Sequence, residues 1–235
     1  MDRIEIVQAI IDKIKGKTYL EIGVQAGESF FPVNSKTKIG VDPKFVINLS
    51  WAQKVKRKIS NILKLQKEML FEMTSDDFFY NKSSVFNKNK IDVALVDGLH
   101  THQQSLKDVL NCLKYMNDKG VIVMHDCSPL SEAMAYPAQS IDDAKKLNLP
   151  GWDGRWNGDV WKTIIYLRSF MRDLNVFVLD CDFGIGIVAK GKPENVLNYS
   201  VKDIEQMSYR DLDSRRSQML NLKKPESLYE FLKNL

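Results

Sequence analysis

The 3 histidines of this 235-residue chain all fall between residues 100 and 125, beside two apolar runs that end in acidic or basic side chains. His100 follows the run that ends in Asp97, and His125 and Asp126 close the next run. Imidazole gains and loses a proton near neutral pH, so a histidine there can act as the general base for a hydroxyl group. The two carboxylates can orient that base or hold a divalent metal ion. We predict that His100 or His125 is the base and that the two aspartates are catalytic partners or metal ligands.

Short β-type runs must position these residues. Five runs rich in aliphatic residues alternate with helical patterns along the chain, at residues 18–23, 38–42, 69–73, 91–97 and 120–125. Continuous apolar runs of this length predict strands that are buried on both faces, as in a parallel sheet. Ligands of such a sheet bind beyond the carboxyl ends of the strands, which is where the aspartates and histidines fall.

Two later runs, 175–180 and 184–189, are separated by a tight connection and predict an antiparallel hairpin. The whole order predicts an α/β fold: a Rossmann-like doubly wound sheet of about seven strands, five parallel plus this C-terminal hairpin, with helices on both faces. Residues 198–235 are polar with helical patterns, so we expect a C-terminal helical extension that packs on the domain or on a second subunit of a homodimer. We therefore expect a domain over 1–197, with 198–235 as an extension of the same domain.

The composition is that of an ordinary globular protein, because 44% of the residues are hydrophobic and 27% are charged. A formal net charge of +4 is too mild to indicate a nucleic-acid surface. The densest basic stretch, at 54–67, carries apolar residues at helical spacing and predicts a surface helix with a solvated basic face. We find no apolar run near the ~20 residues of a membrane span and no signal-peptide pattern. With 3 cysteines that lack metal-ligand spacing, we expect a cytoplasmic protein with reduced thiols.

The first predicted strand ends in a glycine loop between two acids. In Glu21-Ile-Gly23-Val-Gln-Ala-Gly27-Glu28, the two glycines allow the backbone to turn sharply and to approach a ligand closely. The second strand ends in Asp42, whose carboxylate can accept both hydroxyls of a ribose. The loop lacks the middle glycine of G-x-G-x-x-G, and its two glutamates disfavour a pyrophosphate. The pattern suits a cofactor with a cationic, zwitterionic head group.

With these features, residues 15 to 190 resemble the class I S-adenosylmethionine-dependent methyltransferases. The segment from Glu21 to Gly27 is similar to their first motif, E-x-G-x-x-x-G, and Asp42 stands at the acidic end of the second strand. The resemblance implies that the domain over 1–197 binds S-adenosylmethionine. It also implies that Glu21, Gly23 and Gly27 line the cofactor and that Asp42 binds its ribose.

The turn after the third strand commonly reaches the adenine in this family. The resemblance therefore adds Thr74, Ser75 and Asp76 to the cofactor-binding residues, together with Asp97 after the fourth strand. The same turn reads equally well as the N-cap of a helix, and both roles can hold together.

The segments around Asp97 and Asp126 resemble a branch of these methyltransferases that acts on small molecules and sugars. Catechol-type relatives hold magnesium with an aspartate after the fourth strand and an Asp-Asn or Asp-Asp pair after the fifth. Asp97 and Asp126 match the first two ligands, whereas Cys127 occupies the third position and is a poor ligand for a hard cation. The resemblance implies transfer of a methyl group to a hydroxyl of a small polar or glycosyl acceptor, with Mg²⁺ or another divalent metal as an open question.

Residues 151–161 hold three of the chain's 4 tryptophans and follow the fifth strand. Tryptophan faces stack on sugar rings and aromatic groups, and polar neighbours can hydrogen-bond a polyol. We predict that Trp152, Arg155 and Trp156 form an acceptor-binding wall, with His102 as a further acceptor contact. A glycine-rich segment of this kind can also close over a substrate.

Two other functions remain open on the sequence alone. One is an N-methyltransferase or a nucleic-acid methyltransferase; the mild charge and the lack of an Asn-Pro-Pro-Tyr-like motif argue against it. The other is a non-catalytic domain that binds S-adenosylmethionine, and the cluster of titratable groups at strand ends argues against that.

Overall fold

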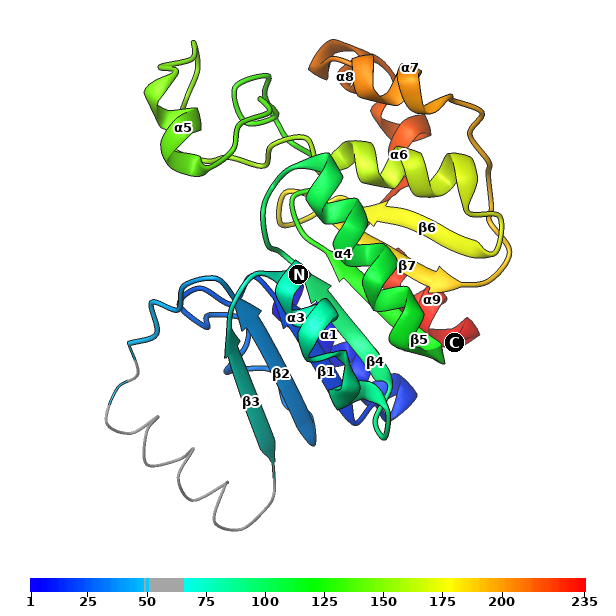
Figure 1. Ribbon diagram of the computed structural model, residues 1–235. Helices are drawn as coiled ribbons and strands as arrows, with labels where there is room; N and C mark the ends of the chain where they lie inside the picture. The colour runs from blue at the N-terminus through cyan, green and yellow to red at the C-terminus, as the bar shows by residue number, and fades with distance from the viewer. Residues whose placement is uncertain (49, 51–65) are drawn as a thin grey trace.

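The computed structural model describes residues 1–48, 50 and 66–235 (Figure 1). The predicted basic helix at 54–67 falls almost wholly outside these residues. Within the described part of the chain, the strands are β1 (Thr18–Ile22), β2 (Thr37–Asp42), β3 (Lys67–Glu72), β4 (Ile91–Val96), β5 (Met116–Met124), β6 (Leu174–Leu179), β7 (Ile185–Lys190) and β8 (Leu222–Lys223). The helices are α1 (Arg3–Ile14), α3 (Ser75–Asn81), η1 (Ser83–Phe86), α4 (His102–Tyr115), α5 (Ile141–Lys146), α6 (Trp161–Phe170), α7 (Val201–Gln206), α8 (Tyr209–Leu220) and α9 (Ser227–Asn234).

The described strands form one eight-stranded sheet in the order β3-β2-β1-β4-β5-β7-β6-β8. The first five strands are parallel, and β7 is antiparallel to both β5 and β6. The prediction of a Rossmann-like α/β sheet closed by an antiparallel hairpin is therefore confirmed. The sheet has one strand more than the expected seven, because the two-residue β8 from the C-terminal extension pairs with β6 and covers its edge.

The strands bury both faces, as their continuous apolar sequences predict. In β4, Val93 and Leu95 pack against α1, whereas Ala94 and Val96 belong to the core on the opposite face. That opposite core includes residues of α3, α4 and α6, and Figure 1 shows the helices on both sides of the sheet. Since successive side chains of a strand alternate between faces, a strand covered on both sides needs apolar residues throughout.

Side-chain caps fix the starts of the helices that border the predicted site. Asp2 and Glu5 form a capping box at the N-terminus of α1, Thr74 caps α3 and Thr101 caps α4. These caps satisfy backbone N–H groups that have no partner within the helix. The helix α6 begins without a side-chain cap. In the described residues, no helix combines the length and apolar character that a membrane span requires.

The C-terminal extension packs on α6. Ile204 of α7 and Leu212 of α8 belong to the same core as Ile164 of α6. Arg168 of α6 is buried and donates to the carbonyl oxygens of Gln218 and Met219, both at 2.6 Å, at the C-terminal end of α8. A cation at this helix end also opposes the partial negative charge of the unpaired carbonyls.

We infer from these contacts that residues 198–235 unfold together with the sheet. Replacement of Arg168 by Met is expected to lower the free energy of unfolding by about 3 kcal/mol, because charged hydrogen bonds to buried carbonyls are lost. Urea unfolding followed by tryptophan fluorescence and far-ultraviolet circular dichroism tests this. The matched control is Arg172→Met, since Arg172 makes one exposed contact with Asn198. Two separate transitions in the wild type would contradict a single cooperative unit.

Candidate functional site

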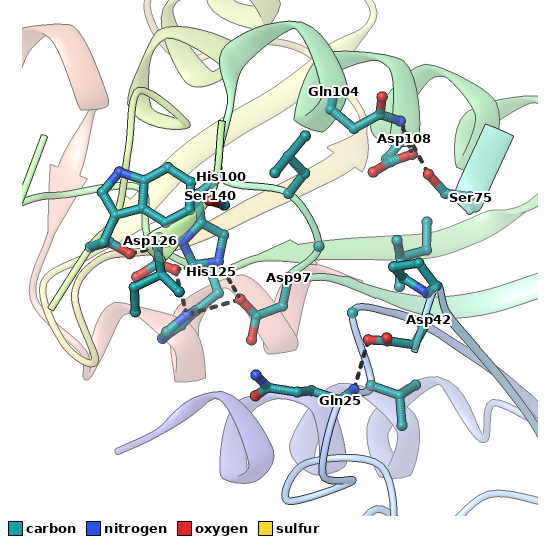
Figure 2. Close-up of a pocket in the computed structure, with 18 of the residues that line it drawn as sticks. Gln25, Asp42, Ser75, Asp97, His100, Gln104, Asp108, His125, Asp126 and Ser140 are labelled. Carbon is teal, nitrogen blue, oxygen red and sulfur yellow. Dashed lines mark hydrogen bonds and ion pairs between the residues drawn. The ribbon is translucent and has the colours of Figure 1, made fainter. Parts of the chain in front are cut away.

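A cavity of about 860 Å³ opens at the carboxyl ends of β1, β2, β4 and β5 (Figure 2). This is the edge at which an open α/β sheet binds its ligands. The predicted site residues that line it are Gly23, Asp42, Thr74, Ser75, Asp76, Asp97, His100, His125, Asp126, Arg155 and Trp156. The predicted residues that lie outside its lining are Glu21, Gly27, His102 and Trp152.

The glycine loop brings the end of β1 against the end of β4. Gly23 has a φ of +91°, and a Cβ there would lie 1.8 Å from the carbonyl oxygen of Asp97. Only glycine combines this backbone conformation with so close an approach. The N–H groups of Gln25 and Lys44 donate to the two carboxylate oxygens of Asp42, at 2.8 and 2.7 Å, and hold that side chain in place.

Glu21 and Gly27 lie outside the cavity lining and stabilise the conformation of the loop. The Glu21 carboxylate is fully buried and accepts hydrogen bonds from the hydroxyls of Tyr19 and Ser29. Burial raises the pKa of Glu21 to about 7, although these two hydrogen bonds act in the opposite direction. Gly27 has a φ of +80°, and a Cβ there would lie 2.2 Å from the ring of Phe31. The resemblance implied cofactor contact for both residues, but the structure places them behind the cavity wall.

His125 lies among carboxylates at the end of β5. Its Nδ1 is 3.2 Å from Asp97 Oδ1 and 3.1 Å from Asp126 Oδ2, and its Nε2 is 3.4 Å from Asp182 Oδ1. Burial alone would lower the pKa of His125, but the charge of Asp97 and the hydrogen bonds to the three carboxylates raise it to about 12. The carboxylates therefore favour the imidazolium form of His125, and Arg3 Nη1 also lies 3.2 Å from its Nε2.

His100 faces the same two aspartates from the other side. Its Nε2 is 3.2 Å from Asp126 Oδ2 and 3.6 Å from Asp97 Oδ1. Its Nδ1 donates to the carbonyl oxygen of Trp156 at 2.8 Å, and the two rings stack with centroids 5.1 Å apart. Burial opposes protonation, but the hydrogen bond to Asp97 and the charge of Asp126 raise the pKa of His100 to about 9.

The loop after β5 turns sharply to present Asp126. This residue has a φ of +61°, in the left-handed region that most side chains avoid, and Asn157 Nδ2 donates to its Oδ1. The next residue, Cys127, is buried in the core below the sheet edge, and its N–H donates to the carbonyl of Gly184. Cys127 is thus separated from the carboxylates. The third candidate donor beside Asp97 and Asp126 is His100, and the possible ligand atoms of these three residues lie within 4.8 Å of one another.

Two further charged residues complete this cluster, and the sequence motifs did not reveal them. Arg3, in the first turn of α1, lies with its Nε 3.5 Å from Asp97 Oδ2 and its Nη1 3.4 Å from Asp182 Oδ2. Asp182 belongs to the connection between β6 and β7 and has a φ of +45°. Arg3 and Asp182 are separated by most of the chain and belong to no common motif. Only the tight connection before Gly184, which contains Asp182, could be recognised from the sequence.

His102 and Trp152 lie away from the cavity lining. His102 is buried between α4 and α6, where its Nδ1 is 3.0 Å from Thr163 Oγ1 and its backbone N–H donates to Asp159. Burial lowers the pKa of His102, so its ring is neutral. Trp152 is half-buried and packs against a small cluster of Ala138, Ala144 and Trp156. Neither His102 nor Trp152 borders the cavity, and the acceptor contacts that the sequence predicts for them stay predictions.

Residues 20–127 match the model of a family described as a methyltransferase domain. The match includes the glycine loop, Asp42, Asp97 and Asp126. The match confirms the prediction of a class I S-adenosylmethionine-dependent methyltransferase over these residues. A comparison with curated protein sequences gave no match.

The chain is also similar to two solved structures. One is a candidate O-methyltransferase from Klebsiella pneumoniae, with a TM-score of 0.48, 13% identity, and 80% of each chain covered. The other is the methyltransferase PaMTH1 from Podospora anserina with bound S-adenosylhomocysteine, with a TM-score of 0.47, 14% identity, and 82% of this chain and 80% of that chain covered.

The buried carboxyl of Glu21 predicts a specific pH dependence of stability. Its pKa is raised from 4.5 to about 7, so folding disfavours its ionisation, and stability is lost as the pH rises from 4.5 to 7. The loss is on the order of 3 kcal/mol. In Glu21→Gln, urea unfolding at pH 4.5 and pH 8 should show that this part of the pH dependence has disappeared. Glu28→Gln, which changes an exposed carboxyl of the same loop, is the control and should retain it; an unchanged profile in Glu21→Gln would contradict the assignment.

Proposed function

We propose that this methyltransferase is an O-methyltransferase that uses S-adenosylmethionine to methylate a hydroxyl of a small polar or glycosyl acceptor. The observation that carries the proposal is the convergence of Asp97, His100 and Asp126 on one point at the edge of the cavity. A carboxylate, an imidazole and a second carboxylate in this arrangement can bind and deprotonate a hydroxyl group. A neutral amine has a free lone pair and can attack the methyl group without first losing a proton. It therefore needs no such base.

The cavity fits the cofactor in size and in the chemistry of its lining. Binding sites for small molecules typically enclose roughly 300–1,000 Å³, so about 860 Å³ leaves room for an elongated cofactor and a small acceptor. The orientation of Asp42 by two backbone N–H groups supports its proposed role at the ribose hydroxyls. Thr74, Ser75 and Asp76 border the same cavity and are proposed to lie at the adenine. When bound, S-adenosylmethionine supplies the electrophilic methyl group of its sulfonium.

The donor set also fits a divalent metal ion. Carboxylates are the ligands that Mg²⁺ and Mn²⁺ prefer, and an imidazole beside them favours Mn²⁺ or another transition-metal ion over Mg²⁺. The hydrogen bond from His100 Nδ1 to the Trp156 carbonyl leaves Nε2 directed at the two aspartates, which is the usual outer-shell arrangement of a metal-bound histidine. We propose that Asp97, His100 and Asp126 would hold the ion. An ion held there would lower the pKa of an acceptor hydroxyl.

The carboxylates that would hold the ion also favour protonation of the two histidines. They raise the pKa of His125 to about 12, so its proposed role is to neutralise and orient Asp97 and Asp126. His100, with its pKa raised to about 9, carries a proton at neutral pH unless a cation replaces it. In the alternative scheme His100 Nε2 accepts the hydroxyl proton while the acceptor oxygen bonds to the methyl carbon and the sulfur–methyl bond breaks.

The wall beside His100 supports a polar ring-shaped acceptor. Trp156 lines the cavity, stacks on His100 and donates from Nε1 to the carbonyl of Tyr136 at 2.9 Å. Arg155 lies over the ring of Phe183, 5.3 Å from its centroid. Aromatic faces next to hydrogen-bonding groups are suited to sugar rings and to phenolic rings.

The proposal is tested by methyl transfer in the presence and absence of divalent ions. Formation of S-adenosylhomocysteine is measured with catechol and with a panel of methyl glycosides, after treatment with excess chelator and after addition of Mg²⁺ or Mn²⁺. We expect activity that requires the ion. Asp126→Asn should reduce kcat at least 100-fold, because it removes a ligand and a charge, while the Kd for S-adenosylmethionine in calorimetry changes less than threefold.

Asp153→Asn is the matched control, since Asp153 is exposed in the segment beside the cavity and, among the residues that the structure describes, pairs with Arg155 alone. Full activity in excess chelator would contradict the metal scheme and leave His100 as the base. Absence of S-adenosylmethionine binding at high micromolar concentration would contradict the proposed function itself.

A further inference from the structure

Two successive residues of the segment between α5 and α6 contact the charged groups of the candidate site. The carbonyl oxygen of Trp156 accepts the hydrogen bond from His100 Nδ1 at 2.8 Å. The side chain of the next residue, Asn157, donates from Nδ2 to Asp126 Oδ1. Two of the three groups that converge at the cavity edge are therefore held by this one segment.

The position of the Asn157 side chain is itself fixed. The backbone N–H groups of Asn157 and Gly158 both donate to the carbonyl oxygen of Met134, at 2.9 and 3.0 Å. The whole of Asn157 is 1% exposed, so its side chain is closely packed and has little freedom to change rotamer. A donor held in this way can impose an orientation on the group that it contacts.

The two oxygens of the Asp126 carboxylate have different surroundings. Oδ1 accepts the hydrogen bond from Asn157, whereas Oδ2 lies 3.2 Å from His100 Nε2 and 3.1 Å from His125 Nδ1. Figure 2 shows Asp126 next to both histidines. The left-handed backbone of Asp126, with a φ of +61°, defines where the side chain begins, but the direction of the carboxylate depends on the partners of its two oxygens.

An asparagine is suited to this contact because its amide is a neutral donor. The two imidazoles gain and lose protons, and His100 would bind the ion in the proposed metal scheme, so their contacts with Asp126 depend on the state of the site. Asn157 Nδ2 donates in every one of these states. A neutral donor also leaves the negative charge of the carboxylate available to a cation, whereas a lysine or an arginine would pair with that charge.

The other end of the amide has no comparable contact. Asn157 Oδ1 is buried and has no hydrogen-bond partner among the residues that the structure describes. The reverse orientation of the amide would place this oxygen against the Asp126 carboxylate, so the hydrogen bond from Nδ2 determines the orientation. A buried oxygen without a donor destabilises the fold. The side chain therefore provides a donor to the site at a cost in stability, which is common among functional residues.

We propose that Asn157 is a positioning residue that acts through Asp126: its amide holds Oδ1 and thereby directs Oδ2 at the point where Asp97, His100 and Asp126 converge. The inference rests on the proposed function, which places activation of the acceptor hydroxyl at that point. Loss of a residue that orients a metal-binding side chain typically changes metal affinity or activity by roughly 10- to 100-fold.

The variant Asn157→Leu removes the donor and keeps a side chain of comparable size. The Kd for Mn²⁺, measured from the electron paramagnetic resonance signal of the free ion in the presence of S-adenosylhomocysteine, should rise roughly 10- to 100-fold, because Oδ2 is no longer directed at the ion. The Kd for S-adenosylhomocysteine in calorimetry should change less than about threefold. With catechol or a methyl glycoside as acceptor, kcat should fall while the KM for the acceptor stays within about threefold of the wild-type value.

Asn117→Leu is the matched control. Asn117 Nδ2 also donates to an aspartate, Asp92 Oδ1, at 2.5 Å, but it does so at the opposite end of β5 from the cavity. The control therefore loses the same type of hydrogen bond and should bind Mn²⁺ like the wild type. If the role of Asn157 were merely structural, both variants would lower the melting temperature and neither would change the affinity for Mn²⁺.

A crystal structure of metal-free Asn157→Leu tests the inference independently of the metal scheme. Asp126 Oδ2 should lie beyond hydrogen-bond distance from His100 Nε2 in this variant. An Asp126 side chain that keeps its wild-type orientation, or a folded variant with the Mn²⁺ affinity of the wild type, would overturn the positioning role. Asn157→Ala is a second variant with the same expected results, and loss of the fold in both would show that Asn157 is a structural residue and would also overturn the inference.

The outcomes for the wild type separate this inference from the proposed function. If the wild type binds S-adenosylhomocysteine but no Mn²⁺, the metal scheme fails, and kcat and the orientation of Asp126 in the variants decide the role of Asn157. If the wild type binds neither, the proposed function fails, and the crystal structure alone decides whether Asn157 orients Asp126.

Discussion

The structure of this site depends on the balance between buried carboxylates and buried cations at the ends of β4 and β5. Asp97, Asp126 and Asp182 meet His100, His125 and Arg3 within a few ångströms. Buried charges of one sign alone would be very costly, so the carboxylates and the cations must compensate one another. The compensation draws together α1, the ends of two central strands and the β6–β7 connection. The pKa of both histidines is raised for the same reason.

Several backbone positions around this charged cluster are left-handed or very closely packed. Asp126 adopts a left-handed conformation, and Gly184 packs so closely on the following loop that a Cβ would lie 2.4 Å from the backbone of Ser128. Gly158 has a φ of +59°, and a Cβ there would lie 1.8 Å from the carbonyl oxygen of His100. Arg216 of α8 donates to Ser128 Oγ and to the Pro129 carbonyl, so the C-terminal extension also supports this loop. Strained residues persist where neighbouring contacts determine their geometry, and such residues concentrate at functional sites.

Local sequence patterns were sufficient for the sheet and for its ligand-binding edge. Apolar runs that end in a glycine, an acid or a histidine predicted β1, β2, β4 and β5, and therefore placed Asp42, Asp97 and His125 at one edge. The partners of these residues could not be predicted, because Arg3 and Asp182 come from distant segments and carry no motif. The position of His102 between two helices could not be predicted either, because a scarce residue type carries no information about its packing. The strand β8 was missed because two residues give no periodicity.

Binding of a divalent ion by the two aspartates and His100 is the central claim, and a crystal structure with S-adenosylhomocysteine and Mn²⁺ tests it most directly. Anomalous scattering from manganese should show one strong peak bounded by Asp97, His100 and Asp126, in a cavity that also holds the cofactor product. A cavity that holds S-adenosylhomocysteine without a manganese peak at these residues would contradict the account.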